Sequence, residues 1–217
     1  MFHFSDITLL ITHYNRSTSL ERLLKAFADL DCHFGDIVVS DDGSKREHIN
    51  YLINLKESYS FNLVTTPVNK GLGNNINKGQ DAVKTPYTLY VQEDFVPEKI
   101  FPIHLQRSLR FMEERKELDM VRFYAYFKYP YLKPVGDGFS EMDFKLTYPG
   151  YRKFYFYSDH PHLRRSTFFQ RFGRYREGIK VEATEYAMMM SVLKNKGRAF
   201  YFDEFTTLFE QKNTHDE

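Results

Sequence analysis

Short runs of apolar, β-branched residues alternate with amphipathic segments through the first half of the chain. Such runs are typical of strands buried on both faces of a sheet, and they cover residues 7–12, 37–39, 61–64 and 87–91. Predicted helices separate them, at 18–27, around 49–53, at 74–83 and from Pro97 onwards. Strands that alternate with helices in this way predict an α/β fold with a parallel sheet covered on both faces.

The second half of the chain is less regular and richer in aromatic residues. Strands are predicted at 120–128, 154–158 and 199–202, and helices at 167–172 and 182–194. Proline and glycine residues between 129 and 150 predict a loop or a hairpin. In the last helix, apolar spacing turns Tyr186, Met189, Met190 and Leu193 towards the core. No linker is recognisable, so we expect one domain over residues 1–217.

Polar residues collect where three of the predicted strands end. They occupy residues 12–16, 41–44 and 92–94. Because the carboxyl ends of parallel strands share one edge of a sheet, and ligands bind at that edge, these residues predict one pocket. Carboxylates at the end of a buried strand need a cation or hydrogen-bond donors. A divalent metal that carries a diphosphate is the simplest occupant.

Composition and charge narrow the range of possible partners and compartments. Apolar residues make up 42% of the 217 residues, enough for a full core, and the net charge is +1. That balance gives no electrostatic reason to expect a nucleic acid partner. No apolar run approaches the ~20 residues of a membrane span. The single cysteine, Cys32, cannot form an internal disulfide, which favours a reducing compartment, so we expect a cytoplasmic protein.

Four motifs identify a family resemblance. Leu9–Arg16 is a strand with a Tyr-Asn turn, and Ile37–Ser44 is a strand that ends in Asp-Asp-Gly-Ser. Asn69-x-Gly71 with Asn77-x-Gly79 follows, and then Leu89–Asp94. In this order and spacing the chain resembles a family 2 glycosyltransferase of the GT-A fold, a three-layer α/β/α sandwich around a mostly parallel sheet. The match runs from residue 7 to about 97 and resumes more weakly from 159 to 190.

The resemblance implies an activity and its partners. The donor is a nucleotide-diphospho-sugar, most often UDP-linked, and the acceptor is a hydroxyl of a glycan or a lipid-linked intermediate, as in polysaccharide biosynthesis. Transfer inverts the anomeric carbon without a covalent intermediate. Residues 1–97 would form the half that binds the nucleotide-sugar, and residues 98–217 the half that binds the acceptor. A divalent metal, Mn or Mg, would assist at the diphosphate.

The resemblance also assigns residues to the donor. Those expected at the nucleotide-sugar are Thr12, Tyr14, Asn15, Asp41, Asp42, Asn69, Gly71, Asn77, Gln92 and Glu93. A carboxylate accepts well from the N3–H of uracil. The resemblance implies that one of the pair Asp41 and Asp42 binds the nucleoside in this way, and Asp42 is favoured. The alternative is that the Asp pair closes a turn after the strand.

Gln92 and Asp94 stand where the family carries its metal-binding Asp-x-Asp. Gln92 replaces the first aspartate, so Asp94 is the predicted metal ligand, with diphosphate and water as the other ligands. The alternative is that Glu93 and Asp94 only cap the turn before Pro97.

Glu185 is the predicted catalytic base, because an inverting transfer needs a carboxylate within reach of the acceptor hydroxyl. The family places its acid near the start of a late helix, often as Thr-Glu-Asp, and here Tyr186 replaces the final aspartate. Glu182 is the second candidate. The alternative role for these carboxylates is to complement the helix dipole.

The acceptor half offers weaker signals. His160 and His162 would lie on the segment that flanks the acceptor, or serve as ordinary polar residues. The basic stretch Arg164–Lys180 could touch an anionic membrane surface at the inner face of the cell membrane, or form a solvated helix face. The aromatic block Phe123–Tyr157 is interpreted first as core and second as an acceptor surface or subunit contact, so a homodimer is also considered.

Two other functions compete with this hypothesis. The altered Asp-x-Asp and Thr-Glu-Asp motifs would suit a sugar-nucleotide-binding protein without activity. A nucleotidyltransferase of similar architecture would need a basic, glycine-rich loop after the first strand, and residues 13–16 hold no glycine.

Overall fold

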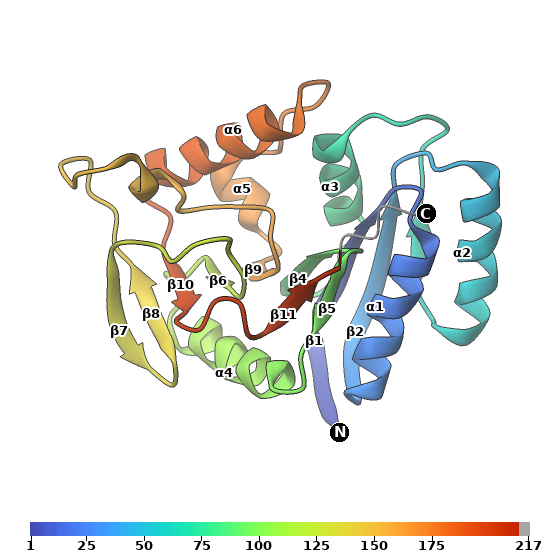
Figure 1. The fold of residues 1–217 in the computed structure, drawn as a ribbon, viewed down its shortest axis with the longest axis horizontal. Coiled ribbons are helices and arrows are strands. Elements are labelled where there is room, and N and C mark those ends of the chain that lie inside the picture. The colour runs from blue at the N-terminus through green and yellow to red at the C-terminus, as the bar shows by residue number, and fades with distance from the viewer. Residues whose placement is uncertain (213–217) are drawn as a thin grey trace.

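The computed structural model describes residues 1–212, and its centre is a mixed sheet in the strand order β3-β2-β1-β4-β9-β6-β10-β8-β7 (Figure 1). The strands of this sheet are β1 (Phe2–His13), β2 (Cys32–Asp41), β3 (Asn62–Val64), β4 (Tyr87–Gln92), β6 (Met120–Arg122), β7 (Leu132–Gly136), β8 (Phe139–Met142), β9 (His162–Arg165) and β10 (Ala199–Phe202). A second, two-stranded antiparallel sheet pairs β5 (Phe95–Pro97) with β11 (Phe209–Gln211). In the described part of the chain, only β8 and β9 run against the direction of the other strands in the large sheet.

Helices cover both faces of the large sheet and make three layers (Figure 1). One face carries α1 (Ser17–Asp29), α2 (Arg46–Ser58) and α4 (Phe101–Glu114), whose buried residues share one core cluster with Leu9 and Ile11 of β1. The other face carries α3 (Leu72–Asp81), α5 (Phe168–Phe172) and α6 (Val181–Lys194), which pack around Leu10 and Val38. Alternate side chains of each strand thus enter opposite cores. The α/β/α sandwich expected from the sequence is confirmed.

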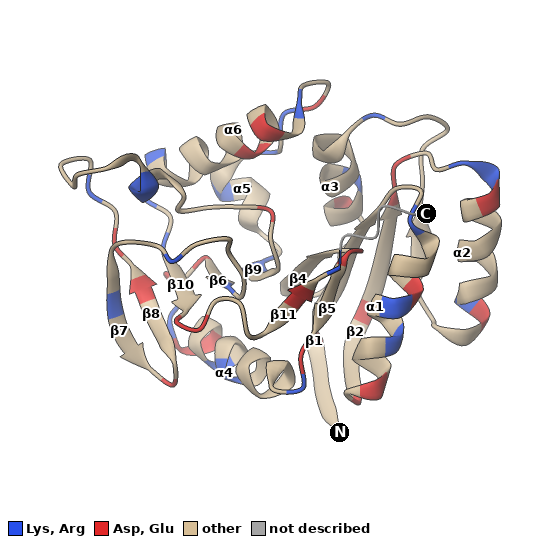
Figure 2. Cartoon of the chain, in the orientation of Figure 1, with Lys and Arg blue, Asp and Glu red and all other residues tan. Residues whose placement is uncertain are grey.

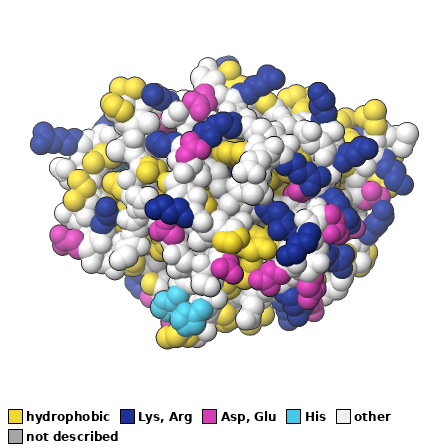
Figure 3. Space-filling model, turned by 180° about the vertical axis from the view of Figure 1, so that it is seen from behind, with side chains coloured by type: hydrophobic (Ala, Val, Ile, Leu, Met, Phe, Trp, Pro, Cys, Tyr) yellow, Lys and Arg dark blue, Asp and Glu magenta, His cyan; other side chains and the backbone are white. Residues whose placement is uncertain are grey.

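Charged side chains are spread over the outer surfaces of the molecule. Lys and Arg lie on helices of both layers rather than on one side (Figure 2). On the face turned away in Figure 1, basic and acidic side chains alternate across the surface (Figure 3). This surface matches the near-neutral charge of the sequence.

The second half departs from the sequence prediction at two strands. Residues 154–158 form no strand, because a 3₁₀ turn covers Tyr151–Phe154 and the carbonyls of Tyr155 and Phe156 accept hydrogen bonds from Arg122 instead of a neighbouring strand. The strand predicted at 120–128 ends at Arg122. The helix expected from Pro97 begins at Phe101, because residues 95–97 pair with β11.

The prediction for the inward face of α6 was wrong in part. Tyr186 and Met190 are exposed, whereas Thr184, Met188 and Val192 are buried together with Met189. The buried stripe follows four-residue spacing from Thr184, whose hydroxyl donates to the Arg176 carbonyl. That anchor rotates the helix away from the face that its apolar residues indicated.

Gly79 allows α3 to lie unusually close to the sheet. A Cβ built there would come within 2.5 Å of Leu10 Cδ1 and 2.9 Å of Ser40 Cβ. Both neighbours belong to strands that end at the polar edge of the sheet. The glycine therefore serves close helix–sheet packing.

We expect Gly79→Ala to lower the free energy of unfolding by about 1–2 kcal/mol, because overpacking outweighs the better helix propensity of alanine. Urea unfolding followed by circular dichroism measures this. Asn54→Ala, on the exposed face of α2, is the control and should change stability by less than about 0.5 kcal/mol. A neutral or stabilising Gly79→Ala would contradict the packing argument.

Candidate active site

A cavity of about 510 Å³ opens at the carboxyl ends of β1, β2 and β4, and we call it the strand-end cavity. Strand register builds its floor, because Thr12 lies opposite Ser40 on β2 and Gln92 on β4. The predicted donor and metal residues that line it are Thr12, Tyr14, Asp42, Asn69, Gly71, Gln92, Glu93 and Asp94. The structure therefore brings most of the predicted donor residues to one edge of the sheet.

Asp41 is fully buried, and the protein itself occupies its carboxylate oxygens. They accept hydrogen bonds from His13 Nδ1 at 2.9 Å, from Thr65 Oγ1 at 2.7 Å and from Ser44, both amide and hydroxyl. His13 Nε2 accepts from the Arg16 amide, which leaves Nδ1 as the protonated nitrogen. Burial acts to raise the pKa of Asp41, but these hydrogen bonds together hold it below its ordinary value. Asp41 thus fastens strand ends and does not line the cavity.

Asp42 both shapes the cavity and borders it. Its carboxylate accepts hydrogen bonds from the amides of Lys70 at 2.9 Å and Gly71 at 2.8 Å. Gly71 has φ of +85°, in the region that favours glycine, and precedes the first turn of α3. Burial raises the pKa of Asp42, and the two amides partly oppose that. Asp42 therefore holds the loop of Asn69 and Gly71 at the rim.

Two predicted residues have structural partners outside the cavity lining. The Asn15 side chain accepts from the Lys45 amide and fixes the turn after β1. Asn77 is a buried residue of α3, and its amide group bonds to the Tyr175 backbone and to Glu177. Asn77 thus joins α3 to the segment that leads into α6.

Asp94 carries the feature expected of a metal ligand. One of its oxygens, Oδ2, accepts from Gln211 Nε2 at 2.9 Å and lies 3.7 Å from Arg16 Nη1. The other, Oδ1, is buried without a hydrogen-bond partner. An unsatisfied buried carboxylate oxygen fits a hard divalent cation. No group of three or more His, Cys, Asp or Glu side chains gathers for a metal within residues 1–212, so phosphate and water oxygens would complete the coordination.

Two other charged groups stand beside Asp94. Glu93 lines the strand-end cavity, and burial raises its pKa to about 7. Arg16 lines the same cavity and is partly exposed, so its guanidinium can meet an anion there. In the sequence, Arg16 is recognisable only as part of the turn after the first strand.

Gln92 does not turn to Asp94 but to the second half of the chain. Its Nε2 donates to Asp159 Oδ2 at 2.9 Å, and the Asp159 amide donates to Glu185 Oε1 at 3.3 Å. Burial, followed by the charge of Glu185, raises the pKa of Asp159. An aspartate at position 92 would add a third carboxylate here, whereas the amide of Gln92 supplies a donor. Asp159 was not singled out in the sequence, because no motif marks it.

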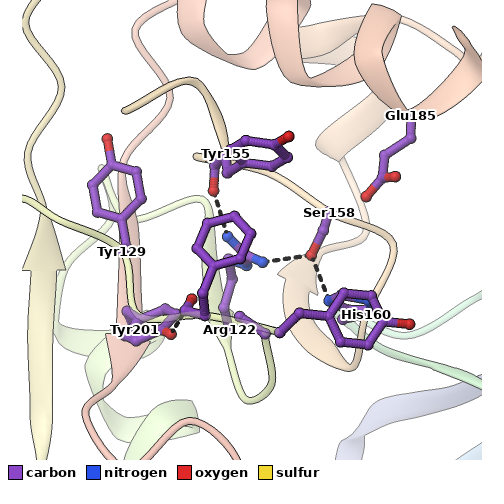
Figure 4. Close-up of a pocket in the computed structure, with 10 residues that line it drawn as sticks. Arg122, Tyr129, Tyr155, Ser158, His160, Glu185 and Tyr201 are labelled. Carbon is purple, nitrogen blue, oxygen red and sulfur yellow. Dashed lines mark hydrogen bonds between the residues drawn. The ribbon is translucent and has the colours of Figure 1, made fainter. Parts of the chain in front are cut away.

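Glu185 borders two further cavities. The Arg122 cavity, of about 250 Å³, is lined by residues that include Arg122, Tyr126, Tyr129, Tyr155, His160 and Glu185 (Figure 4). The Tyr151 cavity, of about 440 Å³, is lined by residues that include Tyr151, Phe154, Tyr157, Glu182, Glu185 and Tyr186. Both predicted candidates for the base thus lie at the larger cavity, and Glu185 alone of the two reaches the smaller one.

His160 and His162 lie in different surroundings. His160 lines the Arg122 cavity, and burial together with the charge of Arg122 lowers its pKa to about 3, so its ring is neutral. His162 is the first residue of β9 and is fully buried between the rings of Tyr90 and Tyr157. Only His160 is placed where an acceptor could reach it.

The basic stretch Arg164–Lys180 does not form one free surface. Arg164 is fully buried and donates to Gln80, and Arg165 donates to backbone carbonyls that include Leu118. Arg171 and Arg174 pair with acidic residues of the same chain. In the described residues no helix has the length and apolar character needed to cross a bilayer.

Solved structures share this fold. Residues 1–349 of TarS from S. aureus, in complex with UDP-GlcNAc, superpose with a TM-score of 0.71 at 17% identity, covering 97% of this chain and 59% of that one. The mannosyltransferase PcManGT from Pyrobaculum calidifontis, in complex with GDP-Man and Mn²⁺, gives a TM-score of 0.60 at 13% identity, covering 89% of this chain and 53% of that one. At such identities the likeness concerns the fold.

Curated relatives match just under half of this chain in sequence. Poly-β-1,6-N-acetyl-D-glucosamine synthase of Staphylococcus epidermidis is 24% identical over 99 residues, which are 46% of this chain and 24% of that protein. The synthase of Staphylococcus aureus strain COL is 25% identical over 104 residues, 48% of this chain and 25% of that protein. The matched region thus spans about a quarter of these relatives.

The sequence model of glycosyl transferase family 2 matches residues 8–190, which include the strand-end cavity, Asp159 and Glu185. The chain therefore belongs to glycosyl transferase family 2.

Proposed function

We propose that this protein is an inverting glycosyltransferase that moves a sugar from UDP to a hydroxyl of a glycan or glycolipid. The observation that carries the proposal is the contact path from Gln92 through Asp159 to Glu185. It joins the strand-end cavity, where the donor would bind, to a half-buried carboxylate that faces two cavities suited to an acceptor. This path would hold Glu185 near both reactants.

The relatives support a role in polysaccharide synthesis. The matched synthases are named for a polymer of N-acetylglucosamine, and the TarS fragment was solved with UDP-GlcNAc. This chain shares the fold of that fragment over nearly its whole length. A UDP-sugar donor is the proposal these names favour.

The donor's diphosphate would lie in the strand-end cavity beside Asp94 and Arg16. Asp94 Oδ1 would hold a divalent cation, Mn²⁺ or Mg²⁺, because that oxygen is buried and otherwise unsatisfied. The cation, when bound, neutralises charge on the departing diphosphate. Arg16 adds a second positive group to the same place, and Asp42 with its loop borders the nucleoside.

Glu185 would accept the proton of the acceptor hydroxyl as that oxygen attacks the anomeric carbon. The Asp159 amide orients the Glu185 carboxylate, and Gln92 in turn holds the Asp159 side chain. Placement of the two bound reactants next to this base supplies much of the rate.

Asp94→Asn should weaken UDP binding in the presence of Mn²⁺ by about tenfold or more, because the amide loses the anionic ligand. Calorimetric titration of UDP with and without Mn²⁺ measures the metal-dependent part. The matched control is Asp137→Asn, in the exposed β7–β8 turn, which should leave the titration unchanged. An unaltered metal dependence in Asp94→Asn would remove Asp94 from the site.

Glu185→Gln should reduce transfer by about 10²–10⁴-fold and leave UDP affinity within about twofold, because only the proton acceptor is lost. Release of UDP in the presence of a glycan acceptor reports turnover. Glu182→Gln is the matched variant on the same helix and should retain transfer. The reverse pattern, with Glu182→Gln inactive and Glu185→Gln active, would move the role to Glu182.

Asp159→Asn should flatten the pH dependence of stability. The raised pKa means that native Asp159 holds its proton more tightly than the unfolded chain does, so its stabilising contribution is complete at low pH and is lost as pH rises through the native pKa. Asparagine mimics the protonated acid at every pH. Between pH 5 and pH 8 we expect the free energy of unfolding of the wild type to fall by at least about 1 kcal/mol more than that of the variant. Equal losses in urea unfolding at both pH values would contradict this.

A further inference from the structure

Arg122 is a buried cation without a carboxylate partner. Its side chain is about 4% exposed, and in the described chain no acidic oxygen lies within ion-pair distance of it. Its Nη1 donates to the carbonyls of Tyr155 at 2.9 Å and Phe156 at 3.3 Å, and its Nη2 donates to the Ser158 hydroxyl. These neutral acceptors satisfy part of the guanidinium and leave its charge unpaired.

A charge in this position is costly unless an anion meets it. Burial lowers the pKa of Arg122, and the nearby Tyr201 and Glu185 oppose that only through space. The neighbouring His160 is neutral, so it neither competes for an anion nor offers a negative charge. The Nε group and the second Nη2 proton have no partner in the described hydrogen bonds and remain available for one.

The walls of the Arg122 cavity suit a sugar ring. Tyr126, Phe127, Tyr129 and Tyr155 line it, and the guanidinium lies 5.9 Å from the ring centre of Tyr201. Aromatic side chains offer apolar faces to the C–H surfaces of a sugar and polar tips to its hydroxyls. At about 250 Å³ the cavity is smaller than the ~300 Å³ or more of pockets for drug-sized ligands, which suits a single ring.

The two ends of the Arg122 cavity carry opposite charges. In Figure 4 Glu185 extends from α6 at one side of the cavity, and Arg122 lies apart from it, next to the aromatic rings of Tyr155 and Tyr201. A sugar that gives a hydroxyl to Glu185 would therefore point another substituent at Arg122. An anionic substituent next to Glu185 would be repelled by its carboxylate. Only the Arg122 end of the cavity therefore suits an anion.

We propose that the Arg122 cavity binds a sugar residue that carries an anionic group, so that the acceptor of this enzyme is an acidic glycan. That the bound sugar is the acceptor rests on the proposed function. The binding of an acidic sugar in this cavity does not depend on it. Carboxylate and phosphate share the chemistry that Arg122 recognises, because a guanidinium pairs with either.

Titration by NMR compares four probes at constant ionic strength without donor. Methyl glucuronide and methyl glucoside 6-phosphate carry the anion, and methyl glucoside and methyl glucuronamide are the neutral counterparts. We expect at least one anionic probe to bind the wild type about tenfold more tightly than both neutral ones. The tighter anionic probe identifies carboxylate or phosphate as the source. Equal affinities for charged and neutral probes would overturn the proposal, and this comparison requires no variant.

Variants then locate the anion. Arg122→Gln should reduce the preference for the anionic probe to within about twofold, and Arg122→Lys should restore part of it, because the charge and not the shape is recognised. Arg46→Gln removes an exposed arginine on α2, outside the cavity lining, and should keep the full preference. Circular dichroism confirms that each variant is folded. A preference that survives in folded Arg122→Gln, or that disappears in Arg46→Gln, would place the anion elsewhere.

The donor half is tested separately. UDP titration with Mn²⁺ reports the strand-end cavity, which shares no lining residue with the Arg122 cavity. Loss of UDP binding with the acidic preference intact would overturn the proposed transferase and keep the acidic site. UDP binding without a preference for the anionic probe would overturn the acidic site and keep the proposed transferase.

Discussion

Burial of Asp41 at the carboxyl end of β2 is the constraint on which the site depends. Its carboxylate draws in His13 from the end of β1 and Thr65 from the segment after β3, so three strand ends are tied to one pair of oxygens. With that network satisfied inside the protein, Asp42 is free to hold the Asn69–Gly71 loop at the cavity rim. The order of the motif therefore has a physical meaning: the first aspartate ties the strand ends together, and the second borders the strand-end cavity.

Sequence reasoning located the strand-end cavity because local patterns determine it. Apolar runs fix where β1, β2 and β4 end, and register then brings Thr12 and Gln92 together without knowledge of the rest of the chain. The second half was harder, because β9 enters the sheet between β4 and β6 against the direction of both. That long-range pairing, which no local pattern indicates, places Asp159 and Arg122 near Glu185.

The exchange of aspartate for glutamine at position 92 is explained by what faces it. Asp159 and Glu185 already bring two carboxylates to this point, and a third would add repulsion in a buried place. Glutamine gives up one candidate metal ligand and links the two halves of the chain instead. Asp94, with an unpartnered oxygen, is then the carboxylate at this edge that is proposed to hold a cation.

The small β5–β11 sheet has a consequence for how the protein matures. Gln211 on β11 donates to Asp94, and the Lys212 amide donates to the Asp94 carbonyl. Residues separated by more than a hundred positions thus have to meet before the Asp94 carboxylate is held in place. During synthesis on the ribosome, the strands and helices of the first half can form early. The Asp94 carboxylate is held in its final position only once β11 has emerged, so the first half alone cannot complete this edge of the strand-end cavity.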